Sequence, residues 1–584
     1  MYKGKLAMPD QIDPIQFEVI RNALLEATEE MAITLRRSAY STNIKTRADF
    51  SCAFFDRDLR PIAQAFTQPV HLGSLTILTP RAVAEYGPEN LAPGDGILVN
   101  DPYRGGVHLN DITLISPVYH KDELFGYVAN LAHHVDVGGG APASIGAFQQ
   151  VYQEGIIIPP VKLVQGGEIS SDIFELVIAQ IRSKRETRGD FRAQVAANNS
   201  GVRRLGALVE QMGLEKVSFY MDRLVEYTRE RAIAEVAKLP RGEFIADGVV
   251  DNDGFSDEPV KLKVRIVIDD EGVLFDFTGC DPQRRAPVNS TYSQTFAACA
   301  YVLKCLIDQD VPVNAGFYEQ VRLVAPEGTV VNCTSPSPVV GGWETQVRLT
   351  DVILKALHQG LPGQVPASTK GTMCQVGFGG TDPRTGQLYA YYETMAGGYG
   401  GRSSKDGPDA VQCHGQNTEN APIEEIEINY PLRIDRYELI EDSEGPGQFR
   451  GGLGLRRDYR FPGHEVSFTV LSDRDRWGPE GLAGGQAGRK AYYILDPEGE
   501  HVELGSKVTI ALAADTVFSY RTCGGGGYGS PLRRDPQAVA RDVRERKILA
   551  ERALDIYGVV VDSSCAVDMQ ATEALRERMA GDGV

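Results

Sequence analysis

The chain has 584 residues, of which 42 % are hydrophobic and 24 % are charged. This is the length and composition of a soluble protein with several buried cores. Its net charge of -19 is spread along the sequence, which argues against non-specific binding to nucleic acid or to an anionic membrane and favours small molecules or proteins as partners.

The cysteine pattern and the hydropathy of the chain predict its compartment. The nine cysteines show no CxxC pair and no zinc-finger spacing, so we expect reduced thiols. The N-terminal residues contain no apolar core of signal-peptide length, and no run of about 18 apolar residues occurs. These features predict a cytoplasmic protein that does not cross a membrane.

The first hundred residues predict a helix followed by strands. A proline at position 14 follows a capping aspartate, and apolar residues then recur at spacings of three and four, which indicates an amphipathic helix up to about Ser38. Residues 47–56 alternate as a strand, with Asp49 at its start. A further strand is expected at residues 97–100, before a glycine-containing loop that lets backbone pass close to a ligand.

The stretch from 107 to 140 holds four of the nine histidines and predicts a β-hairpin with its polar tip at residues 120–123. Such a hairpin brings its two ends together, so His108 and Asp111 at the start face His133 at the finish. Two imidazoles and a carboxylate that converge on one point suit zinc, manganese or iron, with room left for a water molecule. The sequence therefore predicts a divalent-metal site at the base of the hairpin.

Other roles for these residues stay open at this point. A histidine and an aspartate three residues apart are more often hydrogen-bonded core or surface residues than metal ligands, and the histidines at the other end of the hairpin are what favours a metal site here. His133 and His134 point to opposite faces of a strand, so only one of them is expected to be a ligand. Asp49 is a candidate for a further oxygen ligand, and His134 and Asp136 are candidate catalytic residues that support the ligands. The tip histidine, His120, lies at the wrong end of the hairpin.

The remainder of the chain predicts helices over residues 171–238 and a β-rich region from residue 241 onward, with helices near 295–307 and 346–357. The predicted fold class is α+β and multidomain, with mixed and antiparallel β-sheets and flanking helices. The predicted domains are an α+β metal-binding domain at 1–240, a mixed α/β middle domain at 241–430, and a β-rich C-terminal domain at 431–584 that ends in two helices, near 538–555 and 571–579.

Three further features carry weaker signals. Residues 484–491 resemble a phosphate-binding loop but lack the hydroxyl residue that holds magnesium, so tight turns and close backbone packing explain the glycine clusters better. Cys413 and His414 are sequence neighbours, but no nucleophile elbow or oxyanion hole accompanies them. The basic residues 182–188 are either a solvated face or an anion-binding patch.

Several motifs occur in order over hundreds of residues and together identify a family. The motifs are DP at 13–14, TRADFS at 46–51, NDPY at 100–103, GGVHLND at 105–111, GDFRAQ at 189–194, ETMAGG at 393–398, YPL at 430–432, GPGQFRGG at 445–452 and GGGGYG at 524–529. Over nearly its full length the chain resembles the B-type component of the ATP-dependent hydantoinase and 5-oxoprolinase family. Caprolactamase and the acetone and acetophenone carboxylases are related to that family.

The resemblance implies a metal site and a partner. It implies that Asp49, His108, Asp111 and His133 hold a divalent metal such as zinc or manganese. It also implies that ATP and magnesium bind to a separate hydantoinase A-type subunit of the actin and sugar-kinase type, in an (αβ)2 heterotetramer or a larger assembly. One departure is Asn110, where relatives often have proline, and we expect it to alter the loop but not the number of ligands.

The expected function is that of the metal-bearing subunit of an enzyme that opens a cyclic amide, such as a hydantoin, 5-oxoproline or a lactam. The partner would phosphorylate the amide oxygen, and water activated at the metal site would attack the carbon. One alternative is a subunit of an ATP-dependent ketone carboxylase, although the length of the chain favours the ring-opening relatives. Another alternative is a non-catalytic subunit that docks the ATPase, which predicts no tightly held metal.

Overall fold

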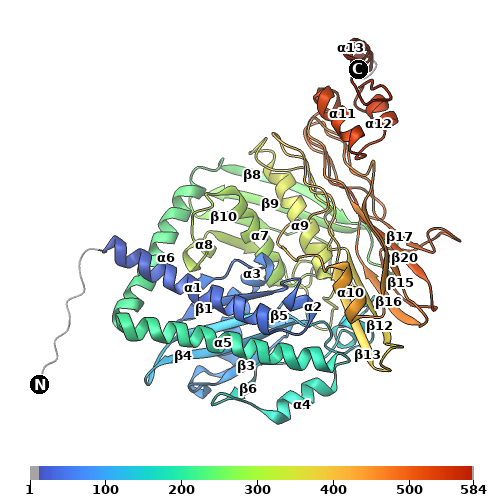
Figure 1. The fold of residues 1–584 in the computed structure, drawn as a ribbon. Coiled ribbons are helices and arrows are strands. Elements are labelled where there is room, and N and C mark those ends of the chain that lie inside the picture. Colours follow the sequence, from blue (N-terminus) through green and yellow to red (C-terminus); the bar gives the residue numbers. More distant parts are fainter. Residues whose placement is uncertain (1–11, 582–584) are drawn as a thin grey trace, which may run out of the picture.

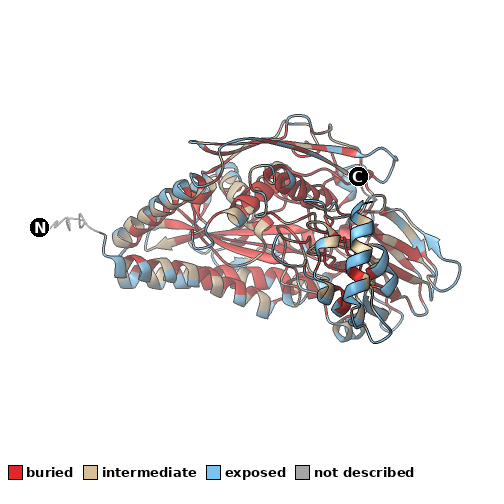
Figure 2. Ribbon diagram, turned by 90° about the horizontal axis from the view of Figure 1, so that it is seen from above, coloured by how far each residue is buried: buried red, intermediate tan, exposed pale blue. Residues whose placement is uncertain are grey.

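The computed structural model describes residues 12–581, and this part of the chain contains four β-sheets, of which the first two pack against helices and the two C-terminal ones pack against each other (Figure 1). One sheet is mixed and the other three are antiparallel, so the expected α+β class with several sheets and flanking helices is confirmed. Figure 2 shows that the inner strands are buried, while the outer faces of the helices and parts of the outer strands are exposed. The division at residues 240 and 430 stays a prediction.

The first sheet has seven antiparallel strands in the order β2-β1-β5-β4-β3-β6-β7, and its centre is the predicted hairpin. Its strands are β1 (Phe50–Asp56), β2 (Pro61–Gln64), β3 (Gly96–Val99), β4 (Asp111–His120), β5 (Glu123–His133), β6 (Val161–Gln165) and β7 (Glu168–Ile169). The turn of the hairpin lies at Lys121, whose φ is 56°. Both strands of the hairpin are buried over most of their length, which fixes their register because a slip of one residue would exchange the two faces.

Helices cover both faces of this sheet because alternate strand residues point to opposite sides. Cys52 and Phe54 pack toward the long helices, whereas Ala53 and Phe55 pack toward the single helix on the other face. The long helices are α1 (Pro14–Ser38), α5 (Lys184–Met212) and α6 (Leu214–Val236), and the single helix is α3 (Pro69–Tyr86). Shorter helices nearby are α2 (Thr42–Lys45) and α4 (Ser171–Ala179).

The second sheet has four strands in the order β11-β10-β9-β8, with a parallel pair between β10 and β11. Its strands are β8 (Gly242–Val250), β9 (Val260–Asp269), β10 (Gly272–Asp276) and β11 (Val321–Val324), and the helices of this region are α7 (Tyr292–Leu306), α8 (Ala315–Tyr318) and α9 (Gly342–Leu357). Gly73 of α3 allows α7 to approach, because a Cβ atom at that position would lie 2.5 Å from the Cβ atom of Ala297. The close approach joins the second region to the first sheet.

Two antiparallel sheets form the C-terminal part of the fold. Their orders are β13-β12-β16-β19 and β14-β15-β20-β17-β18. Their strands are β12 (Gln375–Thr381), β13 (Leu388–Thr394), β14 (Arg433–Leu439), β15 (Leu455–Arg460), β16 (Val466–Leu471), β17 (Tyr492–Leu495), β18 (Val502–Glu503), β19 (Lys507–Leu512) and β20 (Val517–Arg521), and helix α10 (Ile423–Asn429) precedes β14. Aromatic residues such as Phe378, Phe468 and Phe518 fill the space between the sheets. The glycine clusters lie beside them, and a Cβ atom on Gly398 would lie 2.1 Å from the nitrogen of Gly525, so close backbone packing requires glycine there.

The C-terminal helices form a small cluster that projects from the body at the red end of Figure 1. The single helix expected over 538–555 is wrong, because the chain forms α11 (Pro536–Arg544) and α12 (Ala550–Asp555) before α13 (Met569–Gly581). Arg546 has a φ of 56°, which a helix does not allow, and the segment after it is tied to Asp442 by hydrogen bonds in both directions. Tertiary contacts therefore interrupt a favourable helical pattern.

Among residues 12–581, no helix combines the length and the apolar character that a membrane span requires.

A buried ion pair joins the two C-terminal sheets and generates a stability prediction. Arg457 of β15 pairs with Glu393 of β13, and both side chains are fully buried. Tyr459 Oη donates to the same carboxylate over 2.7 Å. Arg457→Met leaves an unpaired buried carboxylate, so we expect a loss of about 3–5 kcal/mol in the free energy of unfolding, measured by denaturant unfolding of the C-terminal sheets.

The matched control for this experiment is Arg21→Gln, since Arg21 and Glu18 form a more exposed pair on α1. Such pairs contribute about 0–1 kcal/mol. Equal effects of the two substitutions would contradict the structural role given to Arg457.

Candidate metal centre

The register of the central hairpin brings the predicted ligands together. Asp111 is the first residue of β4 and lies opposite His133, the last residue of β5. A tight turn precedes the hairpin, in which the backbone N–H of Asp111 donates to the carbonyl of His108 over 3.0 Å. The turn therefore places His108 on the same end of the hairpin as His133.

Three side chains converge at this end of the hairpin, with the carboxylate of Asp111 between two imidazoles. Its Oδ1 lies 3.1 Å from Nδ1 of His133, and its Oδ2 lies 3.2 Å from Nε2 of His108. One potential ligand atom of each of the three residues lies within 4.8 Å of the others, and all three side chains are buried. The imidazole rings of His108 and His133 are 4.9 Å apart.

Asp49 approaches the same end of the hairpin from the neighbouring strand β1. Strand β1 pairs with β5 so that Phe50 lies opposite Ala132, and the backbone N–H of His133 donates to the carbonyl of Asp49 over 3.0 Å. Asp49 thus directly precedes β1 at the end where the hairpin opens, as the sequence predicted.

His71 is a further neighbour of Asp111 that the sequence analysis missed. It lies in the first turn of α3, fully buried, with Nε2 3.6 Å from Oδ2 of Asp111 and 3.9 Å from Oδ1 of Asp49. Neither ring nitrogen has a hydrogen-bond partner within the described residues. No motif spacing links a helix start to a later hairpin, so only the packing of α3 on the sheet reveals this residue.

Two aromatic residues from distant parts of the chain close the site. Trp343, in the first turn of α9, contacts the rings of His71 and His108 at centroid distances of 5.9 Å and 5.8 Å. Tyr392 of β13 stacks on the ring of His133 at 4.7 Å. All three regions of the fold therefore contribute to the walls of one buried site.

Burial sets the charge state of these groups. It lowers the pKa of His108 and of His133 to about 3 in each case, and it lowers the pKa of His71 from its ordinary value. Burial raises the pKa of Asp111, against the attraction of His108 and His71. The imidazoles are consequently neutral at neutral pH, which is the form that binds metal.

Several buried polar atoms of this cluster lack a hydrogen-bond partner, and their chemical type shows whether the cluster could hold a metal. Both ring nitrogens of His108, Nε2 of His133 and Oδ2 of Asp111 are buried without a hydrogen-bond partner in the described chain. Buried polar atoms of native proteins are rarely left unpaired. Nitrogen and oxygen donors of this kind suit a divalent cation such as zinc or manganese, so the donor set fits the metal that the resemblance implies.

His134 and Asp136 point toward other partners. Nε2 of His134 lies 3.0 Å from Oε1 of Gln194 on α5. Asp136 pairs with the guanidinium of Arg182 over 2.9 Å and accepts from the backbone N–H of Arg182 and Gly138. These contacts do not bring either side chain into the cluster around Asp111. Their catalytic role stays a prediction.

Three other sequence predictions concern the surroundings. The side chain of Asn110 donates to the carbonyls of His134 and Ala143 over 2.9 Å and 3.1 Å. These hydrogen bonds connect the turn before β4 with the end of β5 and with the loop that follows it. His120 lies at the tip, 3.8 Å from Glu210. In the basic segment the partly exposed Arg182 pairs with the buried Asp136, so the charge of this arginine already has a partner within the chain.

Comparisons with known proteins agree with this architecture. The sequence profile described as Hydantoinase B/oxoprolinase matches residues 13–531. An uncharacterized protein of Methanocaldococcus jannaschii is 40 % identical, over 97 % of this chain and 100 % of its own length. A putative B-type D-/L-hydantoinase subunit of Pseudomonas sp. strain NS671 is 34 % identical, over 97 % of this chain and 98 % of its own.

Two solved structures share the fold. The crystal structure of ATP-dependent caprolactamase from Pseudomonas jessenii superposes with a TM-score of 0.90 at 28 % identity and covers 97 % of this chain and 100 % of that chain. A nucleotide-free acetone carboxylase superposes with a TM-score of 0.88, covering 98 % of this chain and 83 % of that chain. The acetone carboxylase is only 20 % identical, so this likeness concerns the fold alone.

The cluster generates a prediction about metal content. His108→Ala and His133→Ala each remove one nitrogen donor, so bound metal should fall from about one ion per chain to near zero. Elemental analysis of the purified variants measures this directly. His120→Ala, at the tip of the same hairpin, is the control and should keep its metal. Unchanged metal content in both of the first two variants would exclude the site.

His71 generates a separate prediction. If its imidazole belongs to the surroundings of the metal, His71→Ala should weaken metal binding by roughly 10- to 100-fold, as removal of a supporting residue does in other sites. Competition with a chelator of known affinity gives the change in the dissociation constant. An affinity equal to that of the His120→Ala control would show that His71 acts only in packing.

Proposed function

This chain belongs to the hydantoinase B/oxoprolinase family, and we propose that it is the metal-bearing subunit of an ATP-dependent enzyme that opens a cyclic amide ring. The observation that carries the proposal is the buried cluster of His108, Asp111 and His133, whose donor atoms have no protein partner among the described residues apart from the pairs with Asp111. A hydantoin, 5-oxoproline or a lactam is the proposed class of substrate.

We further propose that ATP and magnesium are bound by a separate subunit of the hydantoinase A type. The sequence holds no complete phosphate-binding loop, because residues 484–491 lack the required hydroxyl. The relative from Pseudomonas sp. strain NS671, which matches over 98 % of its own length, is itself named as one subunit of a hydantoinase. The proposed assembly is an (αβ)2 heterotetramer or larger, and the need for ATP agrees with the cytoplasmic location predicted from the sequence.

In the proposed reaction the partner transfers a phosphoryl group from ATP to the amide oxygen, which makes the amide carbon a better electrophile. Water adds to that carbon, the ring C–N bond breaks and the nitrogen takes a proton. Hydrolysis of the remaining acyl phosphate then releases phosphate and a carboxylate. A divalent metal held by Asp49, His108, Asp111 and His133 supplies Lewis acidity, which polarises a substrate oxygen and acidifies water.

The residues of this chain have three tasks in the proposal. Neutral His108 and His133 can each offer a nitrogen lone pair to a metal ion, because burial lowers their pKa values and keeps the imidazoles unprotonated. Trp343 and Tyr392 exclude bulk water from the corner, which strengthens the electrostatic interactions inside it. His71, also neutral, has a ring N–H that can donate to a substrate oxygen beside Asp111.

Carboxylation of a ketone is the alternative reaction. The likeness in fold to acetone carboxylase is the reason to consider this reaction. However, this chain covers only 83 % of the acetone carboxylase chain, whereas it covers 100 % of the caprolactamase chain. The length therefore favours ring opening. The remaining alternative is a subunit that only docks the ATPase. Such a role does not explain why the chain buries a set of potential metal donors with so few hydrogen-bond partners.

An assay with the A-type partner distinguishes these functions. We expect the reconstituted complex to hydrolyse ATP in proportion to ring opening when hydantoins, 5-oxoproline and lactams are offered, and not with ketones and bicarbonate. His108→Ala in the same complex should lose turnover by at least about 100-fold, because the metal provides several kcal/mol of charge stabilisation. ATP use that depends on a ketone and bicarbonate would instead support the carboxylase.

A further inference from the structure

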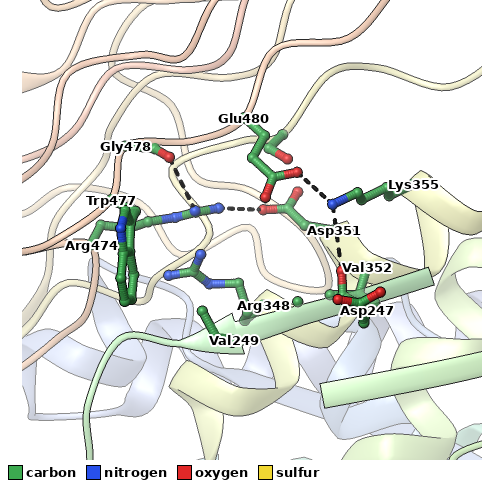
Figure 3. Close-up of a pocket in the computed structure, with 12 residues that line it drawn as sticks. Asp247, Val249, Arg348, Asp351, Val352, Lys355, Arg474, Trp477, Gly478 and Glu480 are labelled. Atoms are coloured by element: carbon green, nitrogen blue, oxygen red, sulfur yellow. Dashed lines mark hydrogen bonds and ion pairs between the residues drawn. The ribbon is translucent and has the colours of Figure 1, made fainter. Parts of the chain in front are cut away.

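A pocket lies between strand β8, helix α9 and the loop after β16 (Figure 3). It has a volume of about 290 Å³, and it contains none of the residues assigned to the metal centre. Arg348 of α9 and Arg474 of the loop meet on its inner side, and Trp477 lies at its rim. The pocket is therefore built from the middle and C-terminal regions of the chain.

Arg348 is the group in this pocket whose hydrogen bonds are incomplete. Its side chain is only 6 % exposed, and Nη2 pairs with Asp251 over 3.1 Å and with Asp473. Nε of Arg348 is buried without a hydrogen-bond partner among the described residues. A guanidinium group offers five N–H donors in a planar fork that matches an oxyanion. Nε is enclosed by protein, but Nη1 makes no hydrogen bond among the described residues and is not enclosed, so Nη1 is the part of the fork that can donate to a ligand.

The buried carboxylates around Arg348 are, by contrast, well satisfied. Asp473 also pairs with Lys507 over 3.2 Å. Asp251 also accepts from the backbone N–H groups of Arg476 and Trp477 over 2.9 Å and 3.1 Å. None of these contacts uses Nη1 of Arg348, so the group that still lacks a hydrogen bond here is a donor.

Asp351 is satisfied in the same way. Its carboxylate lies 3.0 Å from Nε2 of His414 and 3.2 Å from Nη2 of Arg474. Burial raises its pKa, but the hydrogen bonds and charges of His414 and Arg474 outweigh this effect and hold the pKa below its ordinary value. Thr369 also donates to this carboxylate from its backbone N–H and its hydroxyl, so the group stays ionised with its hydrogen bonds filled and has no need of an external cation.

The rim adds a third cation and an apolar surface. Lys355 pairs with Glu480 over 2.7 Å, and both side chains are about half exposed. Asp247 is an exposed carboxylate beside them in Figure 3. The indole of Trp477 is 48 % exposed, which is unusual for so large an apolar side chain in a pocket. A ligand with an anionic end at Arg348 and an apolar body against Trp477 fits this arrangement.

We propose that this pocket binds an oxyanion, a carboxylate or a phosphate group, through the guanidinium of Arg348. Two sources share this chemistry, namely inorganic phosphate and the carboxylate of a small organic acid. The site does not rest on the proposed ring opening, because binding and not turnover tests it.

Helix α9 connects the oxyanion site with the metal centre. Trp343 contacts His71 and His108 in the first turn of α9, and Arg348 follows five residues later. A rise of about 1.5 Å per residue places the two side chains roughly 7.5 Å apart along the helix axis. The same buried helix therefore forms the aromatic wall of one site and supplies the cation of the other.

Isothermal titration calorimetry on the purified full-length chain tests the proposal, with inorganic phosphate in one arm and hexanoate in the other. We expect saturable binding of at least one of the two anions. Arg348→Gln should weaken that binding by roughly tenfold or more, since a charge-assisted hydrogen bond is lost. The metal content of this variant should equal that of the wild type, because Arg348 is not among the proposed metal ligands. Weaker anion binding at unchanged metal content would then place the anion at Arg348 and not at the metal centre.

A second variant covers the case in which Arg348→Gln fails to fold. Val249 lines the same pocket without taking part in the ion pairs, so Val249→Glu introduces a competing carboxylate and leaves Arg348 in place. It should also weaken binding by roughly tenfold or more, because like charges repel in a pocket of low dielectric. Arg203→Gln, an exposed change on α5, is the control and should bind like the wild type.

The outcomes divide clearly. Binding of one anion that both pocket variants weaken supports the site and identifies phosphate or carboxylate as its ligand. Failure of both anions to bind the wild type, or equal affinity of the wild type and Val249→Glu, would overturn it.

Discussion

The antiparallel pairing of β4 with β5 is the constraint on which the rest of the structure depends. Asp111 and His133 face each other only in one register, and a slip of one strand by a single residue would turn its side chain to the opposite side of the sheet from its partner. Buried residues on both faces of the hairpin hold that register, because the long helices α1 and α5 cover one face and α3 covers the other. The chemistry at the end of the hairpin is thus a consequence of how its middle is packed.

Burial also explains why so much of the chain takes part in one site. Desolvation keeps the imidazoles of His108 and His133 neutral, but it penalises every polar atom that has no partner. Trp343 and Tyr392 come from α9 and β13, far along the chain, and they complete the enclosure. Helix α9 then continues to Arg348, so the regions after residue 240 form both walls of the candidate metal centre and the pocket around Arg348.

The sequence predicted the parts of this arrangement that local patterns determine. Alternation and a polar tip predicted the hairpin, and with it the approach of His108 and Asp111 to His133, because the two ends of a hairpin must meet. It did not predict His71, whose position depends on how α3 packs against the sheet. Arg348 was missed for the same reason, since its partners lie on two other segments. The break between α11 and α12 was missed because contacts with Asp442 override the helical pattern.

The central claim is that the open end of the hairpin holds a divalent metal, and anomalous X-ray scattering from a metal-loaded crystal tests it most directly. Data collected on both sides of the absorption edge locate the ion without any assumption about its ligands. We expect one strong peak at about 2.0–2.3 Å from donor atoms of His108, Asp111 and His133, with Asp49 or His71 beside it. A peak at another place in the chain, with none at this corner, would contradict it.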